Sequence, residues 1–180
     1  VLVPLDPHDP VARLRTVIGE ASASCVVAKD WGDAKKLSEV APTLDLSTEV
    51  PLDSGEDDSA MPETQLDPDS TAYIWFTSGS TGVPKGVLIS HRAFHNWCVV
   101  KNAPHGITSE SVVFIAAAST FDPSIGDIFA TWAIGAQVAV APRMLFFANL
   151  GWAVNQLRVT HMTCTPSLWQ SLEAGVVLDT

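Results

Sequence analysis

Basic residues are scarce in this chain of 180 residues: Lys and Arg total 10 against 20 Asp and Glu, and the net charge is -10. Nucleic-acid phosphates require clustered Lys and Arg, so we expect no nucleic-acid partner. No apolar run reaches the length of a membrane span, and the first ten residues, VLVPLDPHDP, lack the basic region of a signal peptide. We therefore expect no membrane partner and no secretory signal.

Cysteine is also scarce: Cys25, Cys98 and Cys164 lie far apart, and none belongs to a C-x-x-C motif. An odd, scattered set suggests neither a zinc site nor a disulfide framework, so we expect a reducing, cytoplasmic compartment. Each cysteine lies in an apolar run and is expected to be a small core residue. His91 and His95 have metal-ligand spacing but lack the Glu of a zinc protease, so we interpret them as packing or surface residues, and we expect no metal site.

Hydrophobic residues make up 47% of the chain, which is typical of a globular domain. Residues 41–70 differ, because they combine many acidic residues and prolines with no Lys or Arg. We expect a surface connection there, with one strand at 43–46, and no calcium site, since calcium-loop spacing is missing. The chain starts without Met and ends abruptly, so we expect it to be a piece of a longer protein.

Apolar runs and helical patterns alternate along the chain, which predicts an α/β fold: a mostly parallel sheet flanked by helices. We expect helices after Pro10, over residues 91–102, from Asp122, over 143–158 and from Ser167. Pro10 and Asp9 would form the start of the first helix, with Asp9 as its cap. The expected strands cover residues 1–5, 25–28, 72–76, 87–89, 112–116, 137–141 and 159–164.

The most informative stretch, residues 71–91, joins two β-like runs through a loop rich in hydroxyl groups and glycine. Glycines let backbone N–H groups turn toward an anion, and hydroxyls can bind phosphate oxygens or Mg²⁺. Lys85 adds a positive charge. The spacing is not that of a Walker loop, because Gly86 follows Lys85 where Ser or Thr would be needed. From the residues alone, a polar hairpin loop is the more natural interpretation.

The string TSGSTGVPKG within this stretch resembles the signature of the adenylate-forming enzymes: acyl-CoA synthetases, luciferases and the adenylation domains of nonribosomal peptide synthetases. The segment VPLDPHDPVARLRTVIGEA resembles the peptide-synthetase branch. The resemblance implies that residues 1–180 are a partial AMP-binding adenylation domain, within its large N-terminal subdomain, and that the catalytic lysine lies beyond Thr180. It also implies that the loop holds the phosphates of ATP, with Mg²⁺. The implied phosphate-binding residues are Thr77, Ser78, Gly79, Ser80, Thr81, Gly82 and Lys85.

Asp122 lies just beyond an expected strand, with Pro123 at the expected first position of a helix, so it could simply cap that helix. However, FDPSIGDIF resembles the family segment whose aspartate holds the α-amino group of the amino acid. The resemblance implies that Asp122 binds this ammonium, and that Pro123 and Gly126 line the side-chain pocket, where Gly126 would leave space. It also implies a further pocket residue, Thr163, in VTHMTCTPSLWQSL, and a gate for the pantetheine arm at Phe121.

The implied function is ATP-dependent activation of an amino acid as aminoacyl-AMP, and its transfer to a phosphopantetheine thiol. The implied partners are a peptidyl carrier domain and a condensation domain of the same multidomain chain. Two alternatives remain: an acyl- or aryl-acid CoA ligase, which Asp122 disfavours because a plain acid has no ammonium, and a degenerate nucleotide-binding module. Residues 1–180 alone are expected to be inactive, and they do not identify the amino acid.

Overall fold

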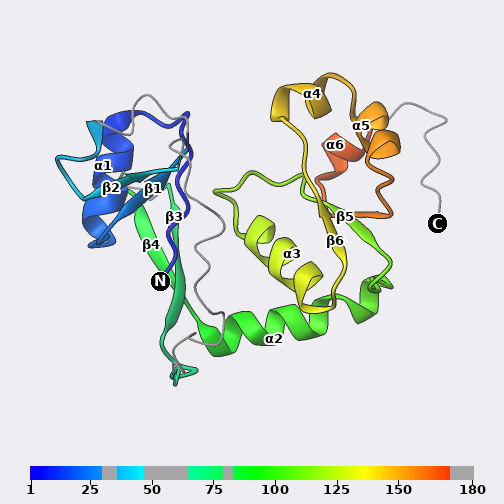
Figure 1. The fold of residues 1–180 in the computed structure, drawn as a ribbon, viewed down its shortest axis with the longest axis horizontal. Coiled ribbons are helices and arrows are strands. Elements are labelled where there is room, and N and C mark those ends of the chain that lie inside the picture. The colour runs from blue at the N-terminus through cyan, green and yellow to red at the C-terminus, as the bar shows by residue number, and fades with distance from the viewer. Residues whose placement is uncertain (30–35, 47–64, 79–82, 171–180) are drawn as a thin grey trace, which may run out of the picture. The chain divides into compact units, whose positions relative to one another are not determined.

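The computed structural model describes residues 1–29, 36–46, 65–78 and 83–170 (Figure 1). The chain divides into two compact units, Val1–His91 and Arg92–Thr180. Each unit has a hydrophobic cluster of its own.

The first unit opens with helix α1 (Val11–Glu20), which is followed by strands β1 (Val26–Ala28) and β2 (Thr43–Asp45). The two strands pair in parallel, as expected for chain segments joined by a crossover. The helix buries one face, and its cluster consists of Leu14, Ile18, Val26, Leu37 and Ala41. The strand expected inside residues 41–70 is thus confirmed; residues 47–64 of that segment lie outside the described residues.

The expected cap of α1 is wrong. Pro10 occupies the N-cap position, and no side chain caps the helix. Asp9 instead accepts a hydrogen bond from Nε of Arg13, one helical turn onward, at 3.1 Å. Asp9 precedes the N-cap residue, so it lies just outside the helix, and its carboxylate pairs with the guanidinium of Arg13 in the first turn.

Strands β3 (Thr71–Thr77) and β4 (Lys85–Ser90) form an antiparallel hairpin, in which Thr77 pairs with Lys85. The strand expected at residues 1–5 shortens to one parallel bridge between Leu2 and Tyr73. Leu2 still makes two backbone hydrogen bonds to β3, at 3.0 and 2.9 Å. Pro4 provides no N–H, so the pairing cannot extend far beyond Leu2 along the chain.

The second unit is built on a parallel sheet with the order β6 (Gln137–Ala139), β5 (Val112–Phe114), β7 (His161–Met162). Val113 and Phe114 are adjacent in β5, point to opposite faces of the sheet and are both almost fully buried. Both faces of this central strand are therefore covered, as expected for a parallel sheet. The prediction of a mostly parallel α/β fold is confirmed.

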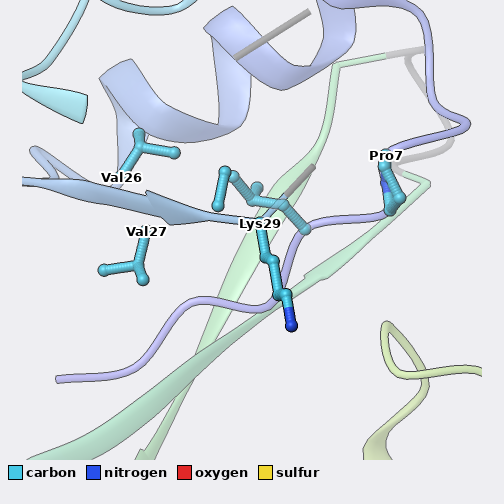
Figure 2. Close-up of a pocket in the computed structure, with 6 residues that line it drawn as sticks. Pro7, Val26, Val27 and Lys29 are labelled. Carbon is cyan, nitrogen blue, oxygen red and sulfur yellow. The ribbon is translucent and has the colours of Figure 1, made fainter. Parts of the chain in front are cut away.

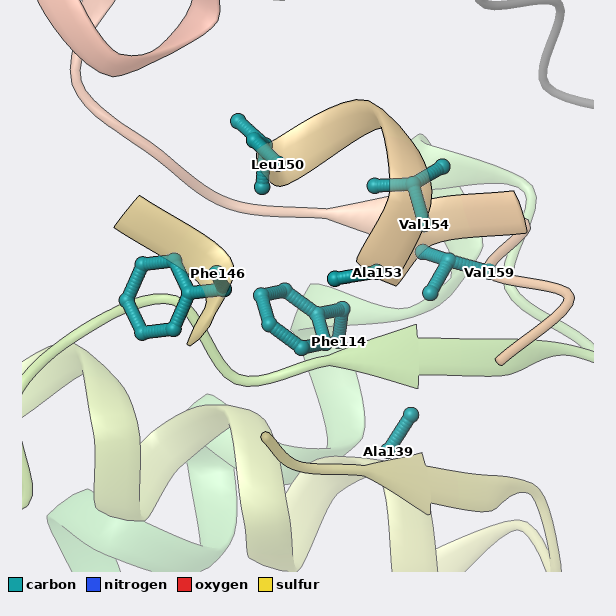
Figure 3. Close-up of a cluster of buried hydrophobic side chains, with 7 residues drawn as sticks. All are labelled: Phe114, Ala139, Phe146, Leu150, Ala153, Val154 and Val159. Atoms are coloured by element: carbon teal, nitrogen blue, oxygen red, sulfur yellow. The ribbon is translucent and has the colours of Figure 1, made fainter. Parts of the chain in front are cut away.

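Helices α2 (His91–Lys101), α3 (Asp122–Ala133), α4 (Arg143–Ala148), α5 (Leu150–Gln156) and α6 (Pro166–Gln170) surround this sheet. A short 3₁₀ turn, Ala103–His105, follows α2. Figure 3 shows α4 and α5 on one side of β5. The rings of Phe114 and Phe146 meet edge to face, at 5.5 Å between centroids, and α3 packs against β6. The cluster on the α4–α5 side consists of Phe114, Ala139, Phe146, Leu150, Ala153, Val154 and Val159.

The single helix expected over residues 143–158 is wrong, because the chain breaks at Asn149. Asn149 has φ -155° and ψ 82°, which ends α4, and its side-chain oxygen accepts a hydrogen bond from the Trp152 N–H at 2.8 Å to cap α5. Asn competes for backbone donors in this way, and the apolar periodicity continues through the break unchanged. Among the residues that the structure describes, no helix has the length and apolarity needed to cross a membrane.

The three cysteines differ in burial, which corrects the expectation that all are core residues. Cys98 is buried and Cys164 is half-buried, but Cys25 is exposed, since it precedes β1 at the edge of the first unit. Burial raises the pKa of the Cys98 thiol, and the nearby Lys101 offsets part of this rise. The thiolate is the reactive form, so Cys98 should be protected both by burial and by its protonation state.

Iodoacetamide at pH 8 should therefore modify Cys25 at least tenfold faster than Cys98 in the native protein. Peptide mass spectrometry over a time course measures both rates. After denaturation in guanidinium chloride, the two rates should become similar. Equal rates in the native protein would contradict the burial of Cys98.

Candidate functional site

The first group of candidate residues lies at the end of the β3–β4 hairpin where the connecting loop joins the two strands. Thr77 ends β3 and pairs with Lys85 at the start of β4, and the Thr77 hydroxyl donates to the Lys85 carbonyl at 3.5 Å. The side chains of Thr77, Ser78 and Lys85 are all exposed. Two hydroxyls and one ammonium are thus presented to solvent at the same end of a rigid hairpin. Gly79, Ser80, Thr81 and Gly82, also expected to bind phosphate, lie outside the described residues.

Gly86, which the site prediction left out, lies next to Lys85 in β4 at a point where the side chains of β3 come close to its backbone. It pairs with Phe76, and a Cβ at Gly86 would lie 3.0 Å from Cγ2 of Ile74 and 3.3 Å from Cζ of Phe76. A Cβ at this position would therefore require the side chains of Ile74 and Phe76 to give way by a few tenths of an ångström. A glycine inside a strand often marks such a close approach, so the sequence did contain this signal.

The donors at the hairpin end suit the oxygens of a phosphate chain, since hydroxyls and an ammonium are its usual protein partners. Within the described part of the chain, no three His, Cys, Asp or Glu side chains gather as a metal site. Mg²⁺ usually reaches an ATP site on the phosphate oxygens and keeps several of its waters. The exposed hydroxyls of Thr77 and Ser78 therefore fit a magnesium-bound triphosphate.

The second group lies at the start of α3. Phe121, rather than Asp122, occupies the N-cap position, with φ -117° and ψ 126°, and no side chain caps the helix. Asp122 is the first residue of the helix and Pro123 the second, which corrects the expected positions of both by one residue. The N-cap position itself therefore belongs to Phe121 and not to Asp122. Its carboxylate still lies where the positive end of the helix dipole favours an anion.

Asp122 and Thr163 belong to the same edge of the sheet. The loop to Asp122 leaves the carboxyl end of β5, and Thr163 directly follows the carboxyl end of β7, the strand that pairs with β5 in parallel. Both side chains are exposed, as is Phe121. Open parallel sheets bind ligands beyond this edge, so the topology brings these candidates to one region of the second unit.

Gly126 is buried beneath an aromatic side chain that the site prediction missed. A Cβ at Gly126 would lie 3.0 Å from Cδ1 and 3.3 Å from Cε2 of Trp97, and closer still to its indole nitrogen. The expectation that Gly126 leaves empty space is therefore wrong: the indole of Trp97, from α2, occupies that space. One turn earlier on α2, the ring of Phe94 meets Phe129 of α3 edge to face, at 5.3 Å between centroids.

A buried polar cluster holds α2 and α3 together next to this contact. The Lys101 ammonium pairs with the Asp127 carboxylate, and both side chains are almost fully buried. Nδ2 of Asn102 donates to the Ala130 carbonyl at 2.6 Å, and the Thr131 hydroxyl donates to the Asp127 carbonyl at 2.6 Å. Burial lowers the pKa of Lys101, whereas the Asp127 carboxylate favours the charged ammonium. Lys101 lies two helical turns after apolar Phe94, so both residues are on the face of α2 that packs against α3. This spacing was the sequence signal that Lys101 would be buried.

The first unit has a separate depression, with a volume of about 190 Å³, beside β1. Figure 2 shows Val26 and Val27 on one side, Pro7 on another and the Lys29 side chain extending away from them. None of the site residues expected from the sequence belongs to its lining, which consists of Leu5, Pro7, Val26, Val27, Ala28 and Lys29.

A protein-family model described as AMP-binding enzyme matches residues 1–179 of the chain. The chain is 34% identical over 170 residues to nonribosomal peptide synthetase atnA of Emericella nidulans, and the match covers 92% of this chain and 2% of that protein. It is 34% identical over 176 residues to nonribosomal peptide synthetase TES of Alternaria alternata, covering 98% of this chain and 3% of that protein. The chain thus spans a very small part of the length of these relatives.

Solved structures show the same fold. A structure of the nonribosomal peptide synthetase FmoA3 superposes with a TM-score of 0.73 at 26% identity, covering 93% of this chain and 18% of that one. VinN in complex with L-aspartate superposes with a TM-score of 0.75 at 24% identity, covering 94% of this chain and 47% of that one. At that identity, the likeness to VinN concerns the fold alone.

The Lys101–Asp127 pair generates a prediction. Lys101→Met should leave the Asp127 carboxylate buried without its partner, which costs about 3–5 kcal/mol. The amide hydrogens of α2 and α3 should then exchange much faster with solvent in the full-length protein. Lys101→Met combined with Asp127→Leu removes both charges and should restore most of the protection. Arg15→Met, which removes the exposed partner of Glu39, serves as the control and should change little; equal exchange in wild type and Lys101→Met would contradict the pairing.

Proposed function

Since the chain belongs to the AMP-binding enzyme family, we propose that the protein containing it is an adenylate-forming ligase that activates an amino acid for nonribosomal peptide synthesis. A carboxylate oxygen of the amino acid attacks the α-phosphorus of ATP, and pyrophosphate leaves, which gives aminoacyl-AMP. The thiol of phosphopantetheine on a peptidyl carrier domain then attacks the carbonyl carbon and releases AMP. One observation carries the proposal: the family signature coincides with a hairpin end that exposes Thr77, Ser78 and Lys85 together.

The hairpin end would hold the triphosphate. Thr77 and Ser78 supply hydroxyl donors and Lys85 supplies a positive charge, while the backbone of residues 79–82 would add N–H groups, as glycine-containing loops do around phosphates. Mg²⁺ bound with ATP would neutralise charge that develops on the leaving pyrophosphate. These residues bind and orient; no residue in positions 1–180 is assigned a proton-transfer or covalent role.

Asp122 would hold the α-ammonium of the substrate. The carboxylate stands at the carboxyl edge of the parallel sheet, in the first turn of α3. Pro123, Gly126 and Thr163 would line the site, and exposed Phe121 would lie where the pantetheine arm enters. An ammonium-binding carboxylate favours an amino acid over the alternative substrates, plain acyl or aryl acids, which have no cation to pair with it.

The assembly that follows from this reaction is also part of the proposal. Residues 1–180 would form part of one adenylation domain, and the carrier and condensation domains would belong to the same protein, as in a nonribosomal peptide synthetase. The reaction uses cytoplasmic ATP, so the protein would work in the cytoplasm.

The phosphate-binding role can be tested with Thr77→Ala combined with Lys85→Ala in the full-length protein. Losing a charge-assisted contact costs about 1.5–3 kcal/mol, so amino-acid-dependent ATP–pyrophosphate exchange should fall roughly tenfold to a hundredfold. Lys36→Ala, which removes an exposed lysine of the first unit, is the control and should leave exchange unchanged. Wild-type exchange in the double variant would rule out this role of the hairpin.

Asp122→Ala separates an amino-acid substrate from a plain acid. The variant should lose roughly tenfold to a hundredfold in exchange with the native amino acid, because the substrate ammonium loses a charge-assisted contact worth about 1.5–3 kcal/mol. Exchange with the des-amino analogue should fall much less. The matched control is Glu110→Ala, which removes an exposed carboxylate of the same unit. An equal loss with both substrates, together with a lower melting temperature, would mean that Asp122 has only a structural role.

A further inference from the structure

The structure assigns to Trp97 a role that rests on the proposed function: we propose that its indole is a specificity-determining wall of the amino-acid site. In this view α2, and not only α3, sets how large a substrate side chain can be. The chemical class that fits is an amino acid with a small or short apolar side chain.

The indole of Trp97 contacts Gly126 along only one edge. Gly126 is buried, while 48% of the Trp97 surface remains exposed. One edge of the indole, including Cδ1 and Cε2, therefore covers the glycine backbone, and the rest of the ring stays accessible to a ligand.

Gly126 also lies close to Asp122 on the same helix. The two residues are four apart in α3, so they lie on the same helix face, one turn or about 6 Å along the axis from each other. A substrate whose ammonium pairs with Asp122 has its Cα only a bond away from that ammonium. The substrate side chain can then reach Gly126, one helical turn away, where the Trp97 indole covers the glycine.

The part of α2 that carries Trp97 is held against α3 by contacts on both sides of Trp97. On α2 it lies between Phe94, whose ring meets Phe129, and Lys101, whose ammonium pairs with Asp127. Both contacts are made to α3, one turn before and one turn after Trp97. The α2 backbone at Trp97 is thus fixed against α3, which keeps the residue next to Gly126.

The chemistry of the wall follows from the indole. Its face is large, rigid and apolar, which favours burial of a short apolar side chain and excludes a longer one by direct overlap. A pocket of fixed depth discriminates about tenfold or more per methylene group. Gly126 alone would suggest a deep pocket, whereas Gly126 covered by Trp97 gives a shallow one.

The test uses Trp97→Ala in the full-length protein and ATP–pyrophosphate exchange with alanine, 2-aminobutyrate, norvaline, norleucine and phenylalanine. Wild type should favour the shorter members. The variant should shift the kcat/KM ratio of norleucine to 2-aminobutyrate by at least tenfold toward norleucine. Trp152→Ala is the matched control, because Trp152 is 50% exposed on α5 and has no role in the site; it should keep the wild-type ratio.

A second pair of variants tests the contact itself. Gly126→Ala should reduce exchange, since its Cβ meets the indole, and Trp97→Ala in the same protein should restore exchange at least partly. If Trp97→Ala does not fold, Trp97→Phe should still shift the preference by one methylene group, because the smaller ring leaves room.

Two outcomes overturn the inference, and they are distinguishable. A folded Trp97→Ala or Trp97→Phe variant with the wild-type ratio would show that the indole does not limit the side chain, while the proposed function stands. A wild-type protein with no amino-acid-dependent exchange would instead reject the proposed function, and this inference with it.

Discussion

Strand β5 is buried on both faces, and most of the second unit follows from that constraint. Val113 and Phe114 are adjacent, point in opposite directions and leave almost no surface to water, so helices must cover both sides of the sheet. Parallel neighbours β6 and β7 satisfy the backbone of β5 on each side. The connections then cross over the sheet, and the polar side chains of Asp122 and Thr163 emerge together at its carboxyl edge.

Helix α3 has to carry polar and small residues for a ligand and yet stay in place. Three contacts with α2, all within one turn of α3, hold the helix in place. Trp97 covers Gly126, Lys101 pairs with buried Asp127, and the ring of Phe94 packs against Phe129. A buried pair adds little net stability over apolar residues, but it penalises any other alignment of the two helices. The α2–α3 contact therefore fixes where the first turn of α3, with its carboxylate, is held.

The sequence predicted those parts of the fold that depend on residues close together in the chain. The hairpin, the parallel α/β order and a helix starting near Asp122 were all predictable from apolar runs and turn residues. The break at Asn149 was not, because its side chain caps a new helix while the apolar spacing continues. The covering of Gly126 by Trp97 was hidden for another reason: the two are 29 positions apart in the sequence, and only tertiary packing brings an indole over a glycine.

The central claim, that a carboxylate attacks the α-phosphorus of ATP, is tested most directly by following the oxygen atoms. The full-length protein would be given ATP, hydroxylamine and an amino acid, chosen because it drives exchange, whose carboxylate carries ¹⁸O. Attack on the α-phosphorus and trapping at the carbonyl carbon should leave one ¹⁸O in AMP, detected by mass spectrometry, with unlabelled pyrophosphate. Label in inorganic phosphate, with ADP as the nucleotide product, would mean attack on the γ-phosphorus and would contradict the account.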